Sequence, residues 1–270
     1  MFNYDESFGR NIGIISSDEM EKLRHTKIAI LGVGGVGGRY AEALVRLGCE
    51  NLLITDVALF DPPDLNRQFS SNMKTMDRSK VECVAEAIKE INPTVQLKQY
   101  YDGVTLENYK EIVDWADLVM DAIDVTAGNV KQKLNQYAYE TGKPVVSNYL
   151  VGQGSICLVF DKEYGISFDQ YFGLDENETQ ETFFQKLAKG VYPNPTSDIH
   201  YTRAVEELLA GKGHIPSSTA NSYVAGALGV MAVRGVIFKR PKIPYAPYYQ
   251  QIDLFDMKYY IEQYNCQASS

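Results

Sequence analysis

The sequence has few residues suited to binding a structural metal ion. Its four cysteines, at positions 49, 83, 157 and 266, stand far apart, and no two of them form a C-x-x-C pair. Only three histidines accompany them, His25, His200 and His214. Structural zinc sites use closely spaced cysteine and histidine ligands. The spacing therefore argues against a zinc site, and a disulfide framework is not expected in this class of protein.

The chain also lacks the signals of secretion and of membrane insertion. The first ten residues, MFNYDESFGR, contain acidic residues and no apolar signal core. The most apolar stretch, residues 219–238, is interrupted by Asn221 and Arg234. A membrane helix needs roughly 18 or more largely uncharged apolar residues. We therefore predict a cytoplasmic protein with no membrane span, in which residues 219–238 form a buried helix.

Positive charge is scarce as well. The chain carries 26 Lys and Arg residues against 35 Asp and Glu residues, a formal net charge of −9. Proteins that bind nucleic acid without sequence preference rely on an excess of positive charge. The charge balance argues against general nucleic-acid binding. The length of 270 residues allows one large domain or two modest ones.

The most informative stretch that is present is residues 27–39, KIAILGVGGVGGR. An apolar strand at 28–31 is followed by a turn containing Gly32, Gly34, Gly35 and Gly37, and then by a helix-period segment. Glycines let the backbone approach phosphate oxygens closely, and a helix N-terminus attracts negative charge. This pattern predicts a nucleotide site. It lacks the G-x-x-x-x-G-K-[ST] spacing of a P-loop.

Strand and helix patterns alternate through most of the chain. Strands are expected at 51–56, 95–100, 117–123, 144–148 and 155–160, with helices at 38–47, 80–91, 106–114 and 127–141. Beyond them, helices are expected at 179–189, 198–210 and 219–238, followed by a strand at 249–253 and a final helix. The alternation predicts an α/β fold with a Rossmann-like, mostly parallel sheet flanked by helices. The sheet is expected to extend on the substrate side.

We divide the chain into segments of one fold. Residues 1–26 are expected to form an N-terminal arm and helix, and residues 27–160 an ATP-binding Rossmann-like domain. Residues 161–215 break the alternation and are interpreted as a crossover segment on the substrate side. Residues 216–270 provide a C-terminal helix and tail that complete the same domain.

Five charged or polar residues are expected around the glycine turn. They are Asp56, Arg67, Gln68, Lys80 and Asp124. Asp56 ends a strand about twenty residues after the turn, where this fold places the acid that binds a ribose hydroxyl. Arg67 and Lys80 can offset charge on phosphates, and Asp124, at a strand end, can hold Mg²⁺. The set indicates an enzyme that cleaves ATP.

Two other functions remain compatible with the residues taken singly. An NAD-dependent oxidoreductase would use the same turn and Asp56. A non-catalytic nucleotide-binding dimer would need no phosphate chemistry. Arg67 and Lys80 also have a plain interpretation as solvated surface charges, and Asp124 as the N-cap of the helix that follows it.

Several motifs together resemble the ThiF/MoeB/HesA family of adenylating enzymes, which includes the activating enzymes of ubiquitin-like proteins and the tRNA threonylcarbamoyladenosine dehydratases. The motifs are GVGGVGG, ITD, DLNRQF, SKVE and DAID, and their mutual spacing also agrees. The resemblance covers residues 8–160 well and residues 214–238 loosely. It implies that ATP and Mg²⁺ are bound, and that AMP is transferred to a carboxylate with release of pyrophosphate.

The resemblance also implies roles for individual residues. Asp56 would bind the ribose, Arg67 and Lys80 the phosphates, and Asp124 the Mg²⁺ ion, while Gln68 would support the loop. Arg10 would reach across a homodimer into the ATP site of the partner. The implied substrate carries a carboxylate, such as a peptide end, a small ubiquitin-like protein or a metabolite.

The sequence departs from the family pattern at three points. A second acid usually follows the ribose acid, and Ala58 stands there instead. Asp64 replaces the usual Asn of the nucleotide site and would repel phosphates unless a cation lies close. Cys157 falls within a strand pattern and is expected in the core, which indicates activation without a thioester.

The crossover segment supplies the candidate substrate contacts. These are His200, Tyr201, Arg203 and His214, all within residues 161–215.

Overall fold

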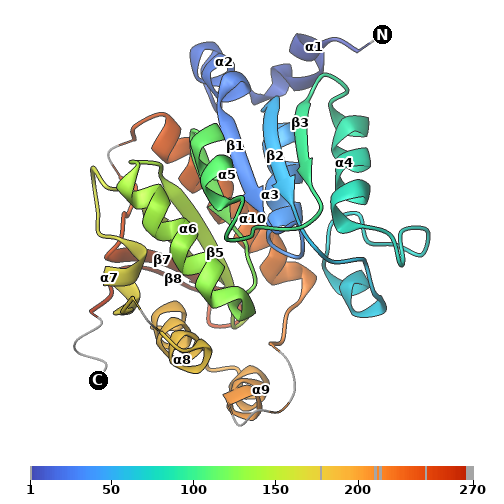
Figure 1. The fold of residues 1–270 in the computed structure, drawn as a ribbon. Helices are drawn as coiled ribbons and strands as arrows, with labels where there is room; N and C mark the ends of the chain where they lie inside the picture. The colour runs from blue at the N-terminus through green and yellow to red at the C-terminus, as the bar shows by residue number, and fades with distance from the viewer. Residues whose placement is uncertain (1, 177, 210–211, 213–214, 241, 266–270) are drawn as a thin grey trace.

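A single eight-stranded sheet forms the centre of the protein, with the strand order β3-β2-β1-β4-β5-β6-β7-β8 (Figure 1). The computed structural model describes residues 2–176, 178–209, 212, 215–240 and 242–265. The strands are β1 (Lys27–Leu31), β2 (Asn51–Thr55), β3 (Gln96–Tyr100), β4 (Leu118–Asp121), β5 (Val145–Val151), β6 (Gly154–Phe160), β7 (Tyr248–Asp253) and β8 (Lys258–Gln263).

The sheet has a parallel and an antiparallel half. Strands β1 to β5 pair in parallel. The apolar runs of β1, β2, β4 and β5 are buried because helices cover both faces, whereas the edge strand β3 is polar and only partly buried. Strands β6, β7 and β8 then continue the sheet in antiparallel fashion beyond β5. The predicted α/β Rossmann-like fold with an extension of the sheet is thereby confirmed.

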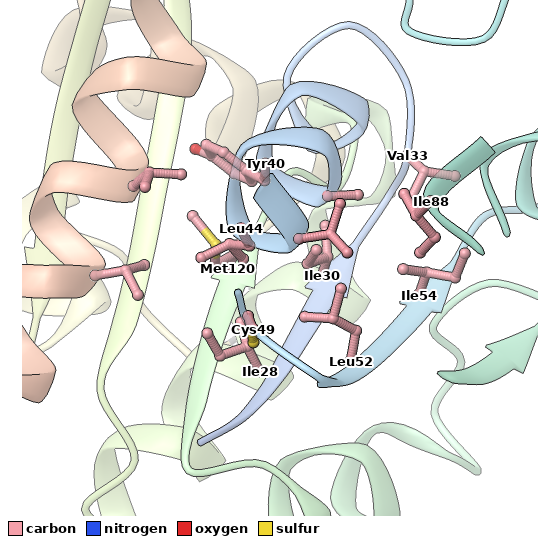
Figure 2. Packing of buried hydrophobic residues seen from close by; sticks show 14 of the residues in the cluster. Ile28, Ile30, Val33, Tyr40, Leu44, Cys49, Leu52, Ile54, Ile88 and Met120 are labelled. Atoms are coloured by element: carbon pink, nitrogen blue, oxygen red, sulfur yellow. The ribbon is translucent and has the colours of Figure 1, made fainter. Parts of the chain in front are cut away.

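Helices cover the sheet in two layers. One face carries α3 (Gly37–Arg46), α4 (Lys80–Ile91) and α10 (Thr219–Ile237), and the other carries α5 (Tyr109–Trp115), α6 (Gly128–Glu140), α7 (Phe168–Phe172) and α8 (Gln180–Val191). Figure 2 shows the first core, in which Tyr40 and Leu44 of α3 pack near Ile28 and Ile30 of β1. Alternate residues of each strand serve the two cores.

The remaining helices lie at the two ends of the sheet. Helices α1 (Tyr4–Phe8), η1 (Gly9–Asn11) and α2 (Ser17–His25) precede β1, and α9 (Ile199–Leu209) follows α8. Figure 1 shows α8 and α9 at the end of the molecule opposite α1 and α2, beyond the carboxyl ends of the parallel strands. Helices α1 and α7 were not expected from the sequence.

The prediction of a final helix is wrong, because residues 258–263 form the edge strand β8. A tight turn sets up the pairing: Asp253 Oδ1 accepts hydrogen bonds from the backbone N–H groups of Phe255 and Asp256, at 2.9 and 3.1 Å. The run Tyr259-Tyr260-Ile261 then pairs with β7. Aromatic and β-branched residues favour strands when a partner strand is present.

Helix α10 is long and apolar enough to span a membrane by length and composition alone. In the structure, 67% of its most apolar window is buried inside the protein. Gly226 and Gly229 allow this packing, since a Cβ atom on Gly226 would lie 2.8 Å from the Arg39 side chain. The helix is therefore placed as a core helix, as the sequence predicted.

The strand order fixes where a ligand can bind. After β1 the chain turns into α3 on one face, and after β4 it turns into α6 on the opposite face. Strands β1 and β4 are neighbours, so the two connections diverge and leave a crevice between them. Ligands of open α/β sheets bind at such a switch point.

Candidate functional site

A cavity of about 1780 Å³ lies at this switch point, at the carboxyl ends of the parallel strands. It runs from the glycine turn after β1, past the loops that follow β2 and β4, to α8 and α9. All the residues that the sequence placed in the nucleotide site line it, with the exception of Arg10. They are Gly32, Gly34, Gly35, Gly37, Asp56, Asp64, Arg67, Gln68, Lys80 and Asp124.

The glycine turn is tight at two positions. Gly32 has φ +87°, and a Cβ atom there would lie 2.5 Å from the carbonyl oxygen of Ala122. A Cβ atom on Gly37 would collide with the carbonyl oxygen of Gly32. Helix α3 then begins at Gly37 without a side-chain cap. Val36 and Gly37 line the cavity, and a helix N-terminus in that position attracts an anion.

Asp56 connects the glycine turn to the end of β2. Its Oδ2 accepts a hydrogen bond from the backbone N–H of Val33 at 2.9 Å, and its Oδ1 accepts one from Ala58 at 2.9 Å. The carboxylate is thereby held at the cavity wall, about one residue beyond the strand. Its position suits the recognition of a ribose hydroxyl.

Asp64 is buried, at 4% exposure, and forms an ion pair with Lys80 whose Nζ–Oδ2 distance is 2.9 Å. Gln68 Nε2 donates a hydrogen bond to Asp64 Oδ1. The backbone N–H of Asp61 donates one to Asp64 Oδ2 at 3.2 Å. Burial alone would raise the pKa of Asp64, but the Lys80 and Asp61 hydrogen bonds outweigh it, so the pKa lies below the ordinary 3.8. Lys80 is therefore the cation that an acid at this position requires.

Arg67 lies directly beside the glycine turn. A Cβ atom on Gly35 would be 3.3 Å from Arg67 Nε. The guanidinium donates to the Pro63 carbonyl at 3.1 Å and to Asn66 Oδ1 at 2.8 Å, so its own loop holds it in place. Arg67 and Lys80 thus bring two positive charges to the cavity wall next to the uncapped end of α3.

Three buried oxygen atoms in the lining have no hydrogen-bond partner among the described residues: Thr55 Oγ1, Gln68 Oε1 and Tyr149 Oη. Buried polar atoms in folded proteins are normally paired. Gln68 Oε1 is also close to the turn, since a Cβ atom on Gly34 would lie 3.5 Å from it. These atoms fit a cavity that receives a polar ligand such as a nucleotide.

Asp124 follows β4 and lines the same cavity. Its Oδ1 accepts hydrogen bonds from the backbone N–H of Thr126 at 2.8 Å and from the Thr126 hydroxyl at 2.7 Å. It caps the short helix η3 (Val125–Ala127), whereas the plain interpretation expected it to cap the helix at 127–141; that helix, α6, begins after Ala127 without a side-chain cap. The described residues contain no group of three or more metal-ligating side chains. Mg²⁺ needs only one or two carboxylates when phosphates supply other ligands, so Asp124 fits that role.

Sequence reasoning missed a buried ion pair in the cavity lining. Lys131 Nζ lies 2.8 Å from Asp121 Oδ1, and both side chains are almost fully buried. Lys131 also donates to the Ile123 carbonyl at 3.2 Å, while Ile123 N–H donates to Asp121 at 3.1 Å. Asn135 Nδ2 donates to the other oxygen of Asp121 at 3.0 Å. The pair therefore fixes the backbone that carries Asp124.

A signal for this pair was present in the sequence. Asp121 follows the apolar run of β4, which ends there and not at residue 123 as predicted. An acid at the end of a buried parallel strand needs a partner, and Lys131 stands ten residues later on the next helix.

Arg10 and most of the proposed substrate contacts lie elsewhere in this chain. Arg10 is exposed on η1 and does not line the cavity. His200 and Arg203 are exposed on α9, outside the lining, whereas Tyr201 lines the cavity at 8% exposure. His214 lies outside the described residues.

The described cysteines are buried, and the pKa values of their thiols are raised, which disfavours the reactive thiolate. Cys157 lies in β6 within the core, as expected, and burial raises the pKa of the Cys49 and Cys157 thiols to about 12. Burial also raises the pKa of Cys83. None of these three lines the cavity. Cys266 lies outside the described residues.

Comparison with known sequences assigns the chain to a family. The sequence model of the ThiF family matches residues 8–269. The chain belongs to the ThiF family. The resemblance inferred from the motifs is thereby confirmed.

Two curated relatives are similar over part of their length. A tRNA threonylcarbamoyladenosine dehydratase of Haemophilus influenzae is 33% identical over 138 residues, covering 51% of this chain and 51% of the relative. A sulfur carrier protein ThiS adenylyltransferase of Escherichia coli is 28% identical over 145 residues, covering 54% and 57%. The matched part is thus about half of each relative.

Solved structures share the fold over most of the chain. PaaA superposes with a TM-score of 0.72 at 18% identity, covering 96% of this chain and 82% of PaaA. Escherichia coli MccB with ATP superposes with a TM-score of 0.67 at 15% identity, covering 91% and 65%. At this identity the likeness concerns the fold alone.

Proposed function

We propose that this chain is an ATP-dependent adenylyltransferase. It activates a carboxylate as an acyl-AMP and releases pyrophosphate, without a thioester cysteine. The observation that carries the proposal is the single cavity that joins the uncapped end of α3, the cations Arg67 and Lys80, and the acids Asp56 and Asp124. The names of a ThiS adenylyltransferase relative and of an ATP-bound structural neighbour support it.

The reaction needs orientation and charge stabilisation rather than a protein nucleophile. A carboxylate oxygen of the substrate attacks the α-phosphorus of ATP. The bond from that phosphorus to the bridging oxygen breaks, and pyrophosphate leaves with the electron pair. In this proposal Arg67 and Lys80 bind the phosphates, Asp56 binds the ribose, and Gln68 and Asp64 hold Lys80 and its loop in place.

Mg²⁺ would supply a Lewis acid that offsets phosphate charge, and Asp124 is the residue that would hold it. The Asp121–Lys131 pair keeps the Asp124 backbone fixed. Because Asp64 already engages Lys80, phosphates would share that cation with Asp64. Asp64 therefore does not leave the site with an uncompensated negative charge.

We further propose a homodimer in which Arg10 acts in the partner's site. Apolar side chains are exposed near Arg10, at Ile12 (46%) and Ile14 (72%), and along α10 at Tyr223 (57%) and Met231 (55%). The two groups are connected, since Arg234 of α10 donates a hydrogen bond to the Ile14 carbonyl at 3.1 Å. Exposed apolar patches of this kind favour association.

A second candidate function is ATP-driven dehydration of a tRNA-borne substrate. It is favoured by the relatives named as tRNA threonylcarbamoyladenosine dehydratases. The net charge of −9 disfavours contact with a phosphate backbone, so we place it second. A cytoplasmic location remains our prediction for either function.

Calorimetry and isotope exchange test the proposal. We expect ATP with Mg²⁺ to bind and NAD not to bind, and substrate-dependent ATP–pyrophosphate exchange to be lost in Arg67→Ala and Lys80→Ala. Arg78→Ala is the matched control, because Arg78 pairs with Glu82 and Glu86 outside the cavity lining. Binding of NAD alone would favour an oxidoreductase. Tight ATP binding without exchange for any substrate would indicate a non-catalytic nucleotide-binding protein.

A further inference from the structure

We propose that the half of the cavity beyond Asp124 binds the apolar body of the carboxylate substrate. This inference rests on the proposed function and specifies its substrate class: a carboxylate whose adjoining segment is uncharged and apolar. We call this half the apolar chamber. Its apolar lining residues are Leu150 and Val151 of β5, Phe184, Leu187, Ala188 and Val191 of α8, and Tyr201, Val205 and Leu208 of α9. Asn148 and Tyr149 of β5 and Tyr192, directly after α8, also line the cavity.

The size of the cavity calls for a second occupant besides a nucleotide. Its volume is about 1780 Å³. Sites for one small ligand are typically about 300–1,000 Å³. The glycine turn, Asp56, Arg67 and Lys80 gather at one end, so the nucleotide is expected there. The remaining volume lies between β5, α8 and α9.

Both helices turn an apolar stripe to the chamber. On α8, positions 184, 187, 188 and 191 follow the i, i+3, i+4, i+7 spacing of a single helix face. On α9, positions 201, 205 and 208 follow the i, i+4, i+7 spacing. The charged residues Arg203, Glu206 and Glu207 of α9 are exposed and outside the lining. In an amphipathic helix of a globular protein, such a stripe normally faces apolar groups.

The chamber is attached to the reacting end of the site. Gln180, at the start of α8, donates a hydrogen bond from its Nε2 to the carbonyl of Val125 at 3.1 Å. Val125 is the residue after Asp124. Phe183 packs on the first turn of α6, where a Cβ atom on Gly128 would lie 2.7 Å from its ring. A group bound between α8 and α9 therefore adjoins the phosphate end of the cavity.

The α9 side of the chamber is also anchored. Asp198 Oδ1 accepts a hydrogen bond from the backbone N–H of His200 at 2.9 Å, and its Oδ2 accepts one from Gln153 at 3.1 Å. Gln153 lies in the turn between β5 and β6, so α9 is held to the sheet next to Val151. The chamber wall is thus built from packed elements on both sides.

The side chains that line the chamber determine which chemical class of substrate segment it binds. Burying a charged group among apolar side chains costs free energy unless the charge is paired, whereas burying an apolar group is favourable. Of the residues that α8 and α9 contribute to the lining, only Gln185 and Lys189 are strongly polar, and both are exposed. The chamber therefore selects an apolar segment next to the carboxylate, which either a peptide end or a fatty acid can provide.

Calorimetry with defined probes tests this. The wild-type protein, saturated with a non-cleavable α,β-methylene ATP and Mg²⁺, is titrated with N-acetyl-Leu-Phe-Leu, with N-acetyl-Glu-Asp-Glu and with octanoate. We expect the apolar peptide or octanoate to bind at least about tenfold more tightly than the acidic peptide. Tighter binding of the apolar peptide than of octanoate indicates that the substrate is a peptide end, and tighter binding of octanoate indicates a fatty acyl chain. Equal affinities of apolar and acidic probes would overturn the inference.

Two variants assign the binding to the chamber. Val205→Asp should lower the affinity for the apolar probe at least about tenfold, since it places a charge in the stripe. Arg203→Asp is the matched control on the exposed face of the same helix and should bind as the wild type does. Phe184→Asp repeats the test on α8, with Glu181→Lys as its control, because Glu181 is exposed on the same helix and lies outside the lining. Unchanged binding in both stripe variants would refute the assignment to the chamber.

Separate readouts distinguish the two proposals. Affinity for the ATP analogue should be unchanged in all four variants, and thermal melting reports whether each variant is folded. Failure of the wild type to bind ATP would refute the proposed function, while titration of octanoate and the apolar peptide without nucleotide still tests the chamber. Normal ATP binding with no preference among the probes would refute the chamber alone.

Discussion

At the scale of single residues, two buried ion pairs organise the site. Asp64 with Lys80 stands beside the glycine turn, and Asp121 with Lys131 stands under the loop that carries Asp124. A buried pair contributes little net stability relative to apolar residues, but removing one partner is costly because the other charge is left unpaired. Both pairs therefore hold the backbone around the nucleotide site in place. We expect the loss of either pair to lower both the free energy of unfolding and the affinity for ATP.

We predict that Lys131→Met destabilises the protein by about 3–5 kcal/mol, because it leaves the Asp121 carboxylate buried without its cation. Denaturant unfolding of this variant, of Asp121→Asn and of the double variant completes a double-mutant cycle. The double variant should lose less than the sum of the two single losses. Strictly additive losses would show that the two side chains do not interact.

The pH dependence of stability should report on Asp64. Its pKa is lowered in the folded protein, so the ionised carboxylate stabilises the fold above the ordinary pKa of 3.8. That contribution is lost as the pH falls through and below this value. Melting temperatures measured between pH 7 and pH 3 should fall less steeply on the acid side in Asp64→Asn than in the wild type. If the melting temperatures of both proteins fall in parallel with pH, the lowered pKa of Asp64 does not stabilise the fold.

At the scale of elements, the glycine turn and α3 form one unit. The turn is tight because the Gly37 backbone closes onto the Gly32 carbonyl, and Asp56 then fixes Val33. Helix α3 starts at that point without a side-chain cap. The sequence predicted this element nearly to the residue because its signals are local: an apolar strand, glycines and a helix period.

We therefore predict that Gly37→Ala abolishes ATP binding, since its Cβ atom would displace the turn that faces the phosphates. Calorimetry with ATP and Mg²⁺ measures the loss. Gly9→Ala is the control, because a Cβ atom on Gly9 meets nothing within 4 Å and its φ is −57°. Full ATP affinity in Gly37→Ala would refute the placement of the nucleotide on this turn.

At the scale of the whole molecule, the sheet combines a parallel nucleotide-binding half with an antiparallel half that ends in β8. The cavity begins where the connections after β1 and β4 diverge and extends to α8 and α9, so one fold provides both a polar and an apolar end. Arg10 lies outside this cavity in its own chain. A contribution from Arg10 to catalysis therefore requires a second copy of the chain.

Subunit mixing tests that requirement. Arg10→Ala and Lys80→Ala should each be inactive alone, because in each homodimer both sites lack one residue. Mixed and re-equilibrated, half the dimers should carry one intact site, restoring about a quarter of wild-type exchange activity. Met231→Glu should yield monomers by light scattering and lose activity as well. Full activity of Arg10→Ala alone would contradict the proposed role in the partner's site.

The sequence by itself determined the fold class, the family and the glycine and charged residues at the nucleotide end of the cavity. Gly32 to Gly37, Asp56, Arg67, Lys80 and Asp124 could be found because each follows a strand or opens a helix, and such positions are readable from local patterns. Parallel strands bring their carboxyl ends to one edge, so residues at strand ends meet without further information.

Only the tertiary structure decided the rest. The partner of Asp64, the Asp121–Lys131 pair and the facing stripes of α8 and α9 depend on contacts between different elements of the fold. Residues 258–263 form a strand and not a helix because β7 offers an edge to pair with. Packing and pairing of this kind override local preference, since the free energy comes from groups that the local sequence does not contain.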